Sequence, residues 1–383
     1  MNRSFYNHSW CTVDIRQAEN NIRFFKEHYA SDCKLMCVVK ANAYGHGAKE
    51  ICPAFERGGA DWFAVSALQE AVELRKSGSR LPVLILGYTS PEDASVLYQY
   101  QITQTIHSLE YARELSASLQ EGERLPVHIK ADTGMGRIGF DCVNRKIEEL
   151  CGEIRQVKAL SNLDAEGIFT HFSVADEFSE DCVSYSDQQA LRFKELVEAL
   201  KKQGILFQLK HCSNSAALLY KPGLQFDMVR LGIAAYGLSP NGAEYAGMEG
   251  AKPLMEMKTM ISQVKEIQAG TGISYGKTFV AQKPMRVATL CVGYADGFRR
   301  SPDASRYVLI HGQTAPLLGR VCMDQCIADV SHIPDVKMGD EAVLFGRSGD
   351  AFLSVDEVAD MWGTINYEVI CGISERVKRV YLR

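Results

Sequence analysis

Lys40 is the clearest candidate for nucleophilic chemistry in this sequence. It follows the apolar segment Leu35–Val39 and begins the run Lys40-Ala41-Asn42-Ala43-Tyr44-Gly45-His46-Gly47. Burial at the end of an apolar strand depresses the pKa of an ammonium group and yields the free amine that Schiff-base chemistry requires. A lysine whose charged head simply reaches solvent at a strand end is the alternative interpretation.

A second group of polar residues could bind a phosphate. Asn214 and Ser215 would begin a helix directly after the apolar segment 207–211, and Gly232 with Ile233 would expose backbone N–H groups after the next one. Helix N-termini and exposed N–H groups bind anions, and barrels often build a phosphate site from their last two loops. Ser215 could equally be a plain helix cap.

Arg230 bears on the type of reaction. If Lys40 and the phosphate loops held a pyridoxal ring, a guanidinium at position 230 would face the ring nitrogen. Arginine hardly ever gives up a proton, so the ring nitrogen would stay unprotonated and the cofactor would be a weaker electron sink. Such a site suits removal and return of an α-proton rather than transamination. A salt bridge to Asp227 is the alternative role for Arg230.

The elements that would position these residues alternate between short apolar runs and longer amphipathic stretches, a pattern typical of βα units. The expected strands are Leu35–Val39, Trp62–Val65, Val83–Leu86, Ile102–Ile106, Val127–Lys130, Gly167–Thr170, Phe207–His211 and Asp227–Arg230. One expected helix spans Asp187–Lys202. Eight βα units predict an α/β protein with a (β/α)₈ TIM barrel over residues 14–245, whose active face lies at the carboxyl ends of the strands. An open doubly wound sheet stays an alternative, because a strand count does not show closure.

After residue 245 the pattern changes to short alternating runs separated by Gly and Pro, which predicts a smaller, mostly-β C-terminal domain over residues 246–383. Its runs are Met255–Val264, Val287–Val292, Tyr307–Ile310, Cys326–Val330, Ala342–Phe345 and Val377–Leu382. Ser354 and Glu357 form a capping box at the start of one helix in this domain.

Composition excludes several classes of protein. The formal net charge is -5 with no long run of either sign, which argues against a nucleic-acid or anionic-membrane partner and favours a small molecule. No apolar run is long enough to span a bilayer and no signal peptide is evident, so we expect a cytoplasmic protein. The 12 cysteines are scattered in apolar runs, and neither disulfides nor a metal site are expected.

Several motifs resemble those of the bacterial alanine racemases over essentially the whole chain. Besides Val38–Gly47, the similar segments are Lys130–Gly139, His211–Ala217, Asp227–Gly237, Gly272–Thr278, Gly293–Gly297, Gly319–Gln325 and Asn366–Val369. The resemblance implies a barrel followed by a β-domain, which residues 1–13 would join. It also implies pyridoxal 5'-phosphate as cofactor and a homodimer with composite active sites.

Carried over residue by residue, the resemblance makes Lys40 the cofactor lysine and the acid/base for D-alanine, and Tyr275 the acid/base for L-alanine. Tyr44, Ser215, Gly232, Ile233 and Tyr367 would hold the phosphate, with Asn214 beside them, and Arg230, steadied by His171, would face the pyridine nitrogen. Arg137 and Met323 would approach the substrate. Lys130 resembles a lysine that is often carbamylated in this family. The residues that resemble the family's substrate entryway are Asp176, Tyr294, Arg300 and Arg320.

The expected function is therefore a two-base alanine racemase, an isomerase that acts through a Schiff base and supplies D-alanine for peptidoglycan. Two bases are physically reasonable, because one lysine on one face of the substrate cannot easily serve both faces. The alternatives are a serine racemase of the same fold and a pyridoxal-phosphate amino-acid decarboxylase. The bulk of Tyr367 favours alanine over serine, although a single hydroxyl is weakly discriminated.

Overall fold

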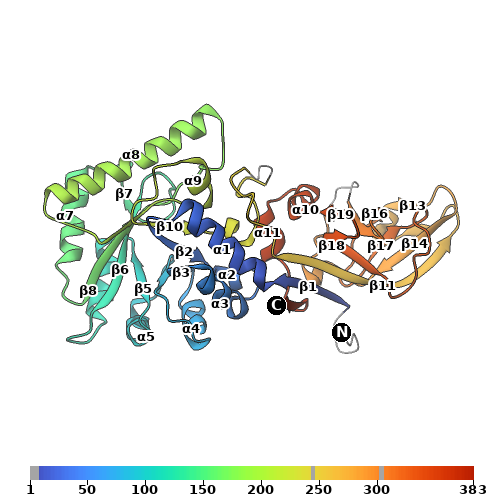
Figure 1. Ribbon diagram of the computed structural model, residues 1–383, viewed down its shortest axis with the longest axis horizontal. Coiled ribbons are helices and arrows are strands. Elements are labelled where there is room, and N and C mark those ends of the chain that lie inside the picture. The colour runs from blue at the N-terminus through green and yellow to red at the C-terminus, as the bar shows by residue number, and fades with distance from the viewer. Residues whose placement is uncertain (1–7, 243–245, 302–305) are drawn as a thin grey trace. The chain divides into compact units, whose positions relative to one another are not determined.

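The computed structural model describes residues 8–242, 246–301 and 306–383 and divides into two compact units (Figure 1). The barrel unit comprises residues 17–43 and 48–252, and the β-unit comprises residues 1–16, 44–47 and 253–383. The sequence predicted domain limits of 14–245 and 246–383, and these limits stay a prediction. Residues 1–7 of the expected N-terminal segment, and residues 243–245, lie outside the described residues.

None of the helices in the described ranges is long and apolar enough to cross a membrane.

Eight parallel strands form the barrel unit, in the order β10-β2-β3-β4-β5-β6-β8-β9, with the short β7 pairing with β6. Their bounds are β2 (Lys34–Val38), β3 (Trp62–Val65), β4 (Val83–Ile85), β5 (Thr103–Ile106), β6 (Leu125–Asp132), β7 (Phe140–Asp141), β8 (Leu163–Phe169), β9 (Leu209–His211) and β10 (Met228–Leu231). Backbone hydrogen bonds from Asp227 N to Lys210 O and from Arg230 N to Ser213 O link the two ends of the sheet. The predicted (β/α)₈ barrel is confirmed, with all eight strands within a few residues of their expected positions.

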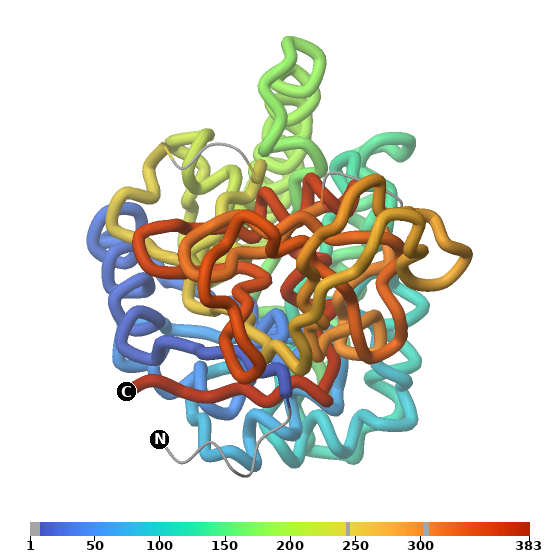
Figure 2. The backbone as a smooth tube through the Cα atoms, turned by 90° about the vertical axis from the view of Figure 1, so that its right-hand side faces the viewer, coloured from blue at the N-terminus to red at the C-terminus, as the bar shows by residue number. Residues whose placement is uncertain are grey.

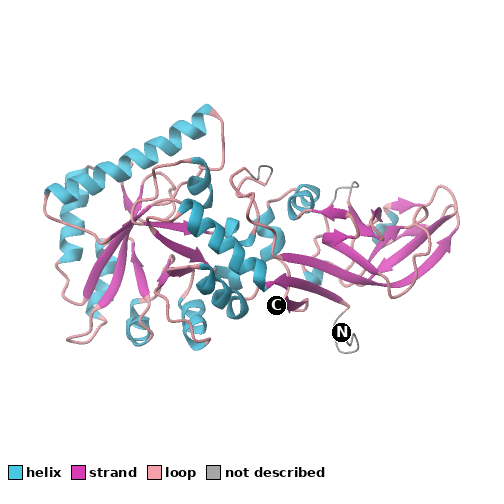
Figure 3. Cartoon of the chain, viewed as in Figure 1, coloured by secondary structure: helices cyan, strands magenta, loops and turns pink. Residues whose placement is uncertain are grey.

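The strands are apolar because both of their faces are covered. All residues of β3, β4 and β10 are buried, and helices surround the sheet (Figure 3). The helices are α1 (Ile15–Tyr29), α3 (Ala48–Gly58), α4 (Leu68–Lys76), α5 (Ala94–Gln99), α6 (Leu109–Ala117), α7 (Ile147–Lys158), α8 (Glu180–Lys202) and α9 (Ser215–Tyr220). The helix predicted over Asp187–Lys202 starts too late. The helix α8 begins at Glu180, seven residues before Asp187, and the hydroxyl of Ser179 caps it.

The β-unit is built on a sheet with the order β19-β18-β15-β16-β17-β14-β11-β1-β20. Its strands are β1 (Ser9–Asp14), β11 (Met255–Ile267), β12 (Gly272–Ile273), β13 (Phe279–Val280), β14 (Met285–Leu290), β15 (Tyr307–Ile310), β16 (Gln313–Leu318), β17 (Cys326–Asp329), β18 (Glu341–Ser348), β19 (Ala351–Leu353) and β20 (Lys378–Leu382). β1 and β20, from opposite ends of the chain, pair in parallel (Figure 2). The mostly-β architecture predicted for this part of the chain is confirmed.

Two helices complete the β-unit, α10 (Val355–Trp362) and α11 (Asn366–Cys371). The predicted capping box is present at the start of α10, where Ser354 Oγ accepts a hydrogen bond from Glu357 N and Ser354 N donates to the Glu357 carboxylate. Residues 44–47 belong to this unit. The ring centroids of Tyr44 and Tyr367 are 6.2 Å apart, and Arg379 Nε donates to Gly45 O at 3.0 Å.

Candidate active site

The residues after Lys40 form a left-handed turn. Ala41, Asn42 and Ala43 have φ of 52 to 54° with ψ of 49 to 53°, and Tyr44 has φ of 50°. A non-glycine residue in this region costs roughly 1–2 kcal/mol, so four in a row need support from their surroundings. Asn42 Oδ1 provides part of it by accepting a hydrogen bond from Ala48 N at 2.8 Å. The turn fixes the backbone on which Lys40 is mounted.

Glu70 provides further support for this turn. Its carboxylate accepts hydrogen bonds from Ala41 N at 2.6 Å, from Ser66 N at 2.8 Å and from Ala67 N at 3.2 Å. One side chain therefore joins the backbone that follows β2 to the start of α4. Hydrogen bonds to an ionised acceptor are stronger than neutral ones, which suits a strained segment.

Arg230 is buried, and its guanidinium is fully engaged in the barrel. It donates to His211 Nδ1 at 2.8 Å, to Thr170 O at 2.8 Å, to Cys212 O at 3.0 Å and to His171 Nδ1 at 3.2 Å. All four of these acceptors are uncharged. Burial lowers the pKa of Arg230 to about 10, which still leaves the guanidinium charged at neutral pH.

The alternative role of Arg230, a salt bridge to Asp227, is not what the structure shows. The carboxylate of Asp227 lies 2.6 Å from Lys210 Nζ and also accepts a hydrogen bond from Lys210 N at 2.7 Å. The Arg230 charge consequently has no carboxylate in direct contact within the described residues.

His171 lies where the cationic side chains of the barrel converge. Burial lowers its pKa well below the usual range, and the charges of Arg230, Lys130, Arg137 and Lys40 lower it further. His171 is therefore neutral, which allows its Nδ1 to accept from Arg230. The guanidinium groups of Arg230 and Arg137 keep their charge, so this end of the barrel favours an anionic ligand.

Lys130 is buried in β6, with its Nζ 4.6 Å from the centroid of the Phe169 ring. Burial lowers its pKa well below the usual range, with smaller contributions from Arg230 and Arg137. The lowered pKa favours the uncharged amine, which is a nucleophile.

Arg137 lies on an exposed loop that Asp132 organises. The Asp132 carboxylate accepts backbone hydrogen bonds from Gly134 and Gly136, each at 3.0 Å, and from Arg137 at 3.1 Å. The sequence predicted Arg137 but not the residue that holds its loop. An Asp that begins a Gly-rich turn was the available signal, because such carboxylates commonly accept N–H groups a few residues on.

The two loops proposed for phosphate binding are joined directly. The helix α9 begins where the sequence predicted, but its cap is Asn214 and not Ser215: Asn214 Oδ1 accepts from Ala217 N at 2.9 Å. Ser215 Oγ accepts from Gly232 N at 2.9 Å, and Ile233 begins a 3₁₀ turn directly after Gly232. Asp176, predicted for the entryway, lies in the loop after β8, where burial raises its pKa.

Tyr275, Tyr294 and Met323 in the β-unit are unusually exposed for large apolar residues, at 67%, 44% and 53%. Ser274 Oγ donates to Arg320 O, so the loop carrying Tyr275 is tied to the loop carrying Arg320 and Met323. These predicted residues therefore share one region of the β-unit surface. Exposed apolar side chains of this kind often mark a contact with another protein.

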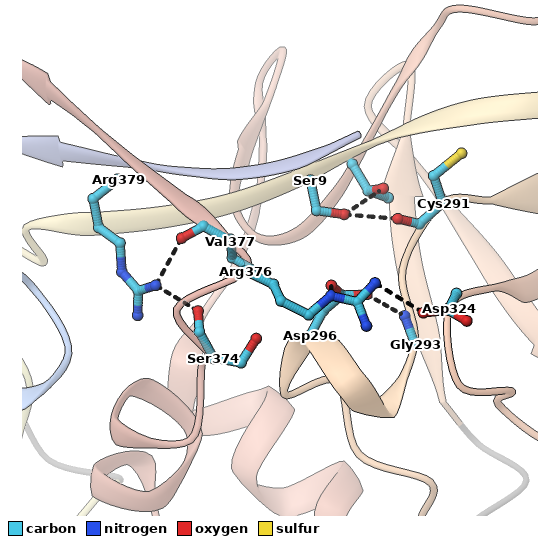
Figure 4. A network of polar contacts seen from close by, with 10 residues as sticks. Ser9, Cys291, Gly293, Asp296, Asp324, Ser374, Arg376, Val377 and Arg379 are labelled. Carbon is cyan, nitrogen blue, oxygen red and sulfur yellow. Dashed lines mark hydrogen bonds and ion pairs between the residues drawn. The ribbon is translucent and has the colours of Figure 1, made fainter. Parts of the chain in front are cut away.

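The turn that carries Tyr294 is held by a network of carboxylates and one arginine (Figure 4). Asp296 accepts from Gly293 N at 3.0 Å and lies 3.5 Å from Arg376, which also pairs with Asp324 at 2.8 Å. Tyr294 N donates to the carbonyl of residue 322 at 3.1 Å. Arg300, also predicted for the entryway, follows this turn as an exposed residue.

No cluster of three or more His, Cys, Asp or Glu side chains in the described ranges could hold a metal ion. All 12 cysteines are free thiols, and six of them are buried.

Comparisons with known proteins agree over both units. Residues 13–240 match the family model described as alanine racemase, N-terminal domain, and residues 254–381 match alanine racemase, C-terminal domain. An alanine racemase of Desulforamulus reducens is 43% identical, covering 97% of this chain and 98% of that protein. Alanine racemase 1 of Clostridium acetobutylicum is 41% identical over 98% of this chain and 95% of its own length.

Solved structures show the same agreement. The alanine racemase of Clostridium difficile 630 superposes with a TM-score of 0.91 at 38% identity, covering 99% of this chain and 97% of that one. The alanine racemase of E. faecalis gives a TM-score of 0.92 at 36% identity over the full length of both chains. The chain therefore belongs to the alanine racemase family.

Proposed function

We propose that the chain interconverts L-alanine and D-alanine with pyridoxal 5'-phosphate as cofactor, as the names of its relatives indicate for those proteins. The observation that carries the proposal is that Lys40, Arg137 and Arg230 lie at or beyond the carboxyl ends of the barrel strands β2, β6 and β10, with Arg230 donating to His171 Nδ1 at 3.2 Å. The phosphate of the cofactor and the carboxylate of the amino acid are the anions that such a cluster would attract.

The residues of the barrel fit this cofactor. Lys40 would offer an amine to its aldehyde, and Ser215, whose Oγ joins the loops after β9 and β10, would offer its hydroxyl to the phosphate together with backbone N–H groups of these loops. When bound, the cofactor withdraws electrons from the substrate and makes the α-proton acidic. Arg230 donates hydrogen bonds but hardly ever a proton, and this favours proton return to the substrate over side reactions.

Two residues then move the α-proton. Lys40 would serve the face of the substrate that leads to D-alanine, and Tyr275 the face that leads to L-alanine. Each would sit on its own side of the substrate, because a tethered lysine cannot reach both faces. Arg137 would bind the substrate carboxylate and hold the α-carbon between the two groups.

The exposure of Tyr275 and Met323 supports a homodimer. Both are carried by loops of the β-unit, and both would be covered if a second copy presented its barrel to them. Each active site would then combine Lys40 of one copy with Tyr275 of the other.

Lys130 supports the proposal through its chemistry. An uncharged amine reacts with CO₂ to give a carbamate, which replaces a potential cation by an anion. A carbamate at Lys130 would attract Arg137 and orient it toward the substrate.

Turnover of L- and D-alanine against L- and D-serine, with added cofactor, tests the function. We expect both alanine enantiomers to be interconverted faster than serine. Preferred turnover of serine would favour the serine racemase alternative, and release of CO₂ from an amino acid would favour the decarboxylase.

Borohydride reduction followed by peptide mapping tests the cofactor site. A covalent pyridoxyl adduct is expected on Lys40 and absent from the Lys40→Ala variant. An adduct on another lysine, or none, would overturn the assignment of Lys40.

A further inference from the structure

Two buried histidines connect Arg230 to a carboxylate deeper in the barrel. Arg230 donates to His211 Nδ1 at 2.8 Å, and His211 Nε2 lies 2.9 Å from His128 Nδ1. His128 Nε2 lies 3.5 Å from the carboxylate of Glu166, whose side chain is 21% exposed. Glu166 precedes the carboxyl end of β8 by three residues, so this contact lies away from the active face.

The charge of Arg230 fixes where every proton in this series lies. A guanidinium only donates, so His211 Nδ1 must accept and the His211 proton is on Nε2. That proton points at His128 Nδ1, which must accept in turn. The proton of His128 is therefore on Nε2, facing the carboxylate of Glu166.

The opposite arrangement is excluded by the same contacts. A doubly protonated His128 would set an N–H against the N–H of His211, and reversing His211 would set its Nδ1–H against Arg230. Burial, outweighing the nearby Glu166, also lowers the pKa of His128 and keeps the ring neutral. The donors thus all point from the cation toward the anion.

Local backbone features are shaped around this contact. The pairing of β6 with β8 shifts between Val127 and His128, whose partners are Ala165 and Gly167, so Glu166 is left over as a bulge. Bulges re-aim side chains. A Cβ on Gly167 would come within 2.6 Å of three atoms of the His128 ring, so only glycine leaves room for that ring.

His128 Nε2 is buried, and no acceptor within normal hydrogen-bond distance of it is found in the described residues. The Glu166 carboxylate at 3.5 Å is the acceptor that this N–H faces. A buried donor without an acceptor is costly, so the bulge that turns Glu166 toward His128 has a physical purpose.

We propose that Glu166 is a positioning residue for Arg230, acting through the oriented hydrogen-bond series Arg230–His211–His128–Glu166. The carboxylate stabilises the His128 proton on Nε2, the same arrangement that Arg230 imposes from the other end, and so strengthens the acceptor that His211 Nδ1 offers to the guanidinium. Arg230 is thereby held in place by an anion that it does not touch. The effect of Glu166 on catalysis rests on the proposed function, whereas the hydrogen-bond series does not depend on it.

The first test uses the protein without cofactor, so its result is independent of the proposed function. Ring nitrogens of ¹⁵N-labelled histidines are observed by NMR and assigned through single His→Gln variants. We expect His128 and His211 to carry their protons on Nε2 and to stay neutral at pH values near and above the ordinary histidine pKa of about 6.5. Titration of His128 in this range, or a proton on its Nδ1, would overturn the proposal.

Glu166→Gln removes the charge at nearly constant size, and Asp164→Asn is the matched control. Asp164 is two residues away on the same strand and pairs with Arg124 at the surface. We expect Glu166→Gln to shift the ring nitrogens of His128 and, less strongly, of His211, while Asp164→Asn leaves them unchanged. Equal spectra for both variants would refute a role of Glu166 in the series.

The second test measures kinetics of the cofactor-loaded enzyme. Glu166→Gln is expected to lower kcat about threefold to tenfold with KM changed less than about twofold, because it acts on Arg230 rather than on substrate binding. His128→Gln, whose amide can still accept at one atom and donate at the other, should retain more activity than His128→Leu. Equal loss in the two His128 variants would indicate simple packing and would contradict the proposal.

The NMR test and the kinetic test distinguish a failure of the proposed racemase function from a failure of the positioning role of Glu166. If the NMR result holds but the enzyme shows no racemase activity, the proposed function fails and the hydrogen-bond series stands. If racemase activity is present but Glu166→Gln matches Asp164→Asn in every measurement, the positioning role fails alone.

Discussion

The carboxylate of Glu70 accepts the backbone N–H of Ala41 at 2.6 Å, so a residue in the first turn of α4 holds the turn that follows Lys40. The turn is left-handed at four residues without glycine, and its conformation depends on such contacts. The lysine of the proposed reaction is thus positioned by two neighbouring βα units rather than by its own strand alone.

Replacing Glu70 with Ala should loosen this turn. Three backbone N–H groups lose their acceptor, and we expect a loss of about 1–3 kcal/mol in the free energy of unfolding. Denaturant unfolding measures this loss, and proteolysis should show faster cleavage within residues 41–48. Glu73→Ala is the control, since the carboxylate of Glu73 on the same helix accepts from the side chain of Gln69 and not from the turn after Lys40. Equal stability of the two variants would contradict the role of Glu70.

The stability of the barrel should fall in mild acid. His128, His171 and His211 have folded-state pKa values below the ordinary value of about 6.5, so the unfolded chain binds more protons than the folded chain below that pH. Stability is then present above pH 6.5 and is lost as the pH falls, by up to about 1.4 kcal/mol per pH unit for each histidine. Unfolding curves at a series of pH values give the slope.

His128→Gln should make the free energy of unfolding less dependent on pH, by the equivalent of about one bound proton. The substitution removes one group that takes up its proton only when the chain unfolds. His332→Gln, at an exposed histidine, is the matched control. A slope that does not differ between these two variants would show that His128 is protonated in the folded protein.

Lys130 should bind CO₂ when bicarbonate is supplied. Its uncharged amine is expected to give a carbamate signal in ¹³C NMR with labelled bicarbonate, and Lys130→Ala should abolish that signal. Lys158→Ala is the control, because burial also lowers the pKa of Lys158 but its Nζ donates to Ala165 O outside the active face. A signal that survives Lys130→Ala would assign the carbamate elsewhere.

The architecture could be predicted because parallel strands covered on both faces are continuous apolar runs. Segments such as 62–65 had clear limits, and the active face followed from the rule that it lies after the strands. Lys40, Arg230 and Ser215 were predicted as site residues in this way, since each follows or ends an expected strand, and their roles stay predictions. Helix starts were less certain, as α8 shows, because a short polar first turn carries little hydrophobic periodicity.

The supporting contacts could not be predicted for physical reasons. Residues 41–44 adopt left-handed backbone angles although none of them is glycine, so the sequence contains no sign of this turn. The role of Glu70 in supporting it could therefore not be predicted. The contact between His128 and Glu166 depends on a bulge, and a bulge inverts the side-chain alternation from which facing residues are inferred. The grouping of residues 44–47 with the β-unit likewise depends on packing against α11 and β20.

Replacing Tyr275 with Phe should separate the two directions of the reaction. The variant keeps the ring but lacks the hydroxyl that would move the proton on the L-face, and such a group typically contributes about 10² to 10⁴ in rate. In deuterated water we expect α-proton exchange from L-alanine to fall more than exchange from D-alanine. Tyr98→Phe, at another exposed tyrosine, should have no effect. Equal loss in both directions would argue against two bases.

A composite site makes a prediction about mixed dimers. If Lys40 of one copy works with Tyr275 of the other, a dimer of one Lys40→Ala chain and one Tyr275→Phe chain contains one native site and one doubly altered site. After unfolding and refolding an equal mixture, half of the dimers are mixed, and about one quarter of the wild-type activity should return. Sites formed within a single chain would return none, because every chain in the mixture carries a substitution. Each variant refolded alone sets the background, and sedimentation velocity measures the amount of dimer present.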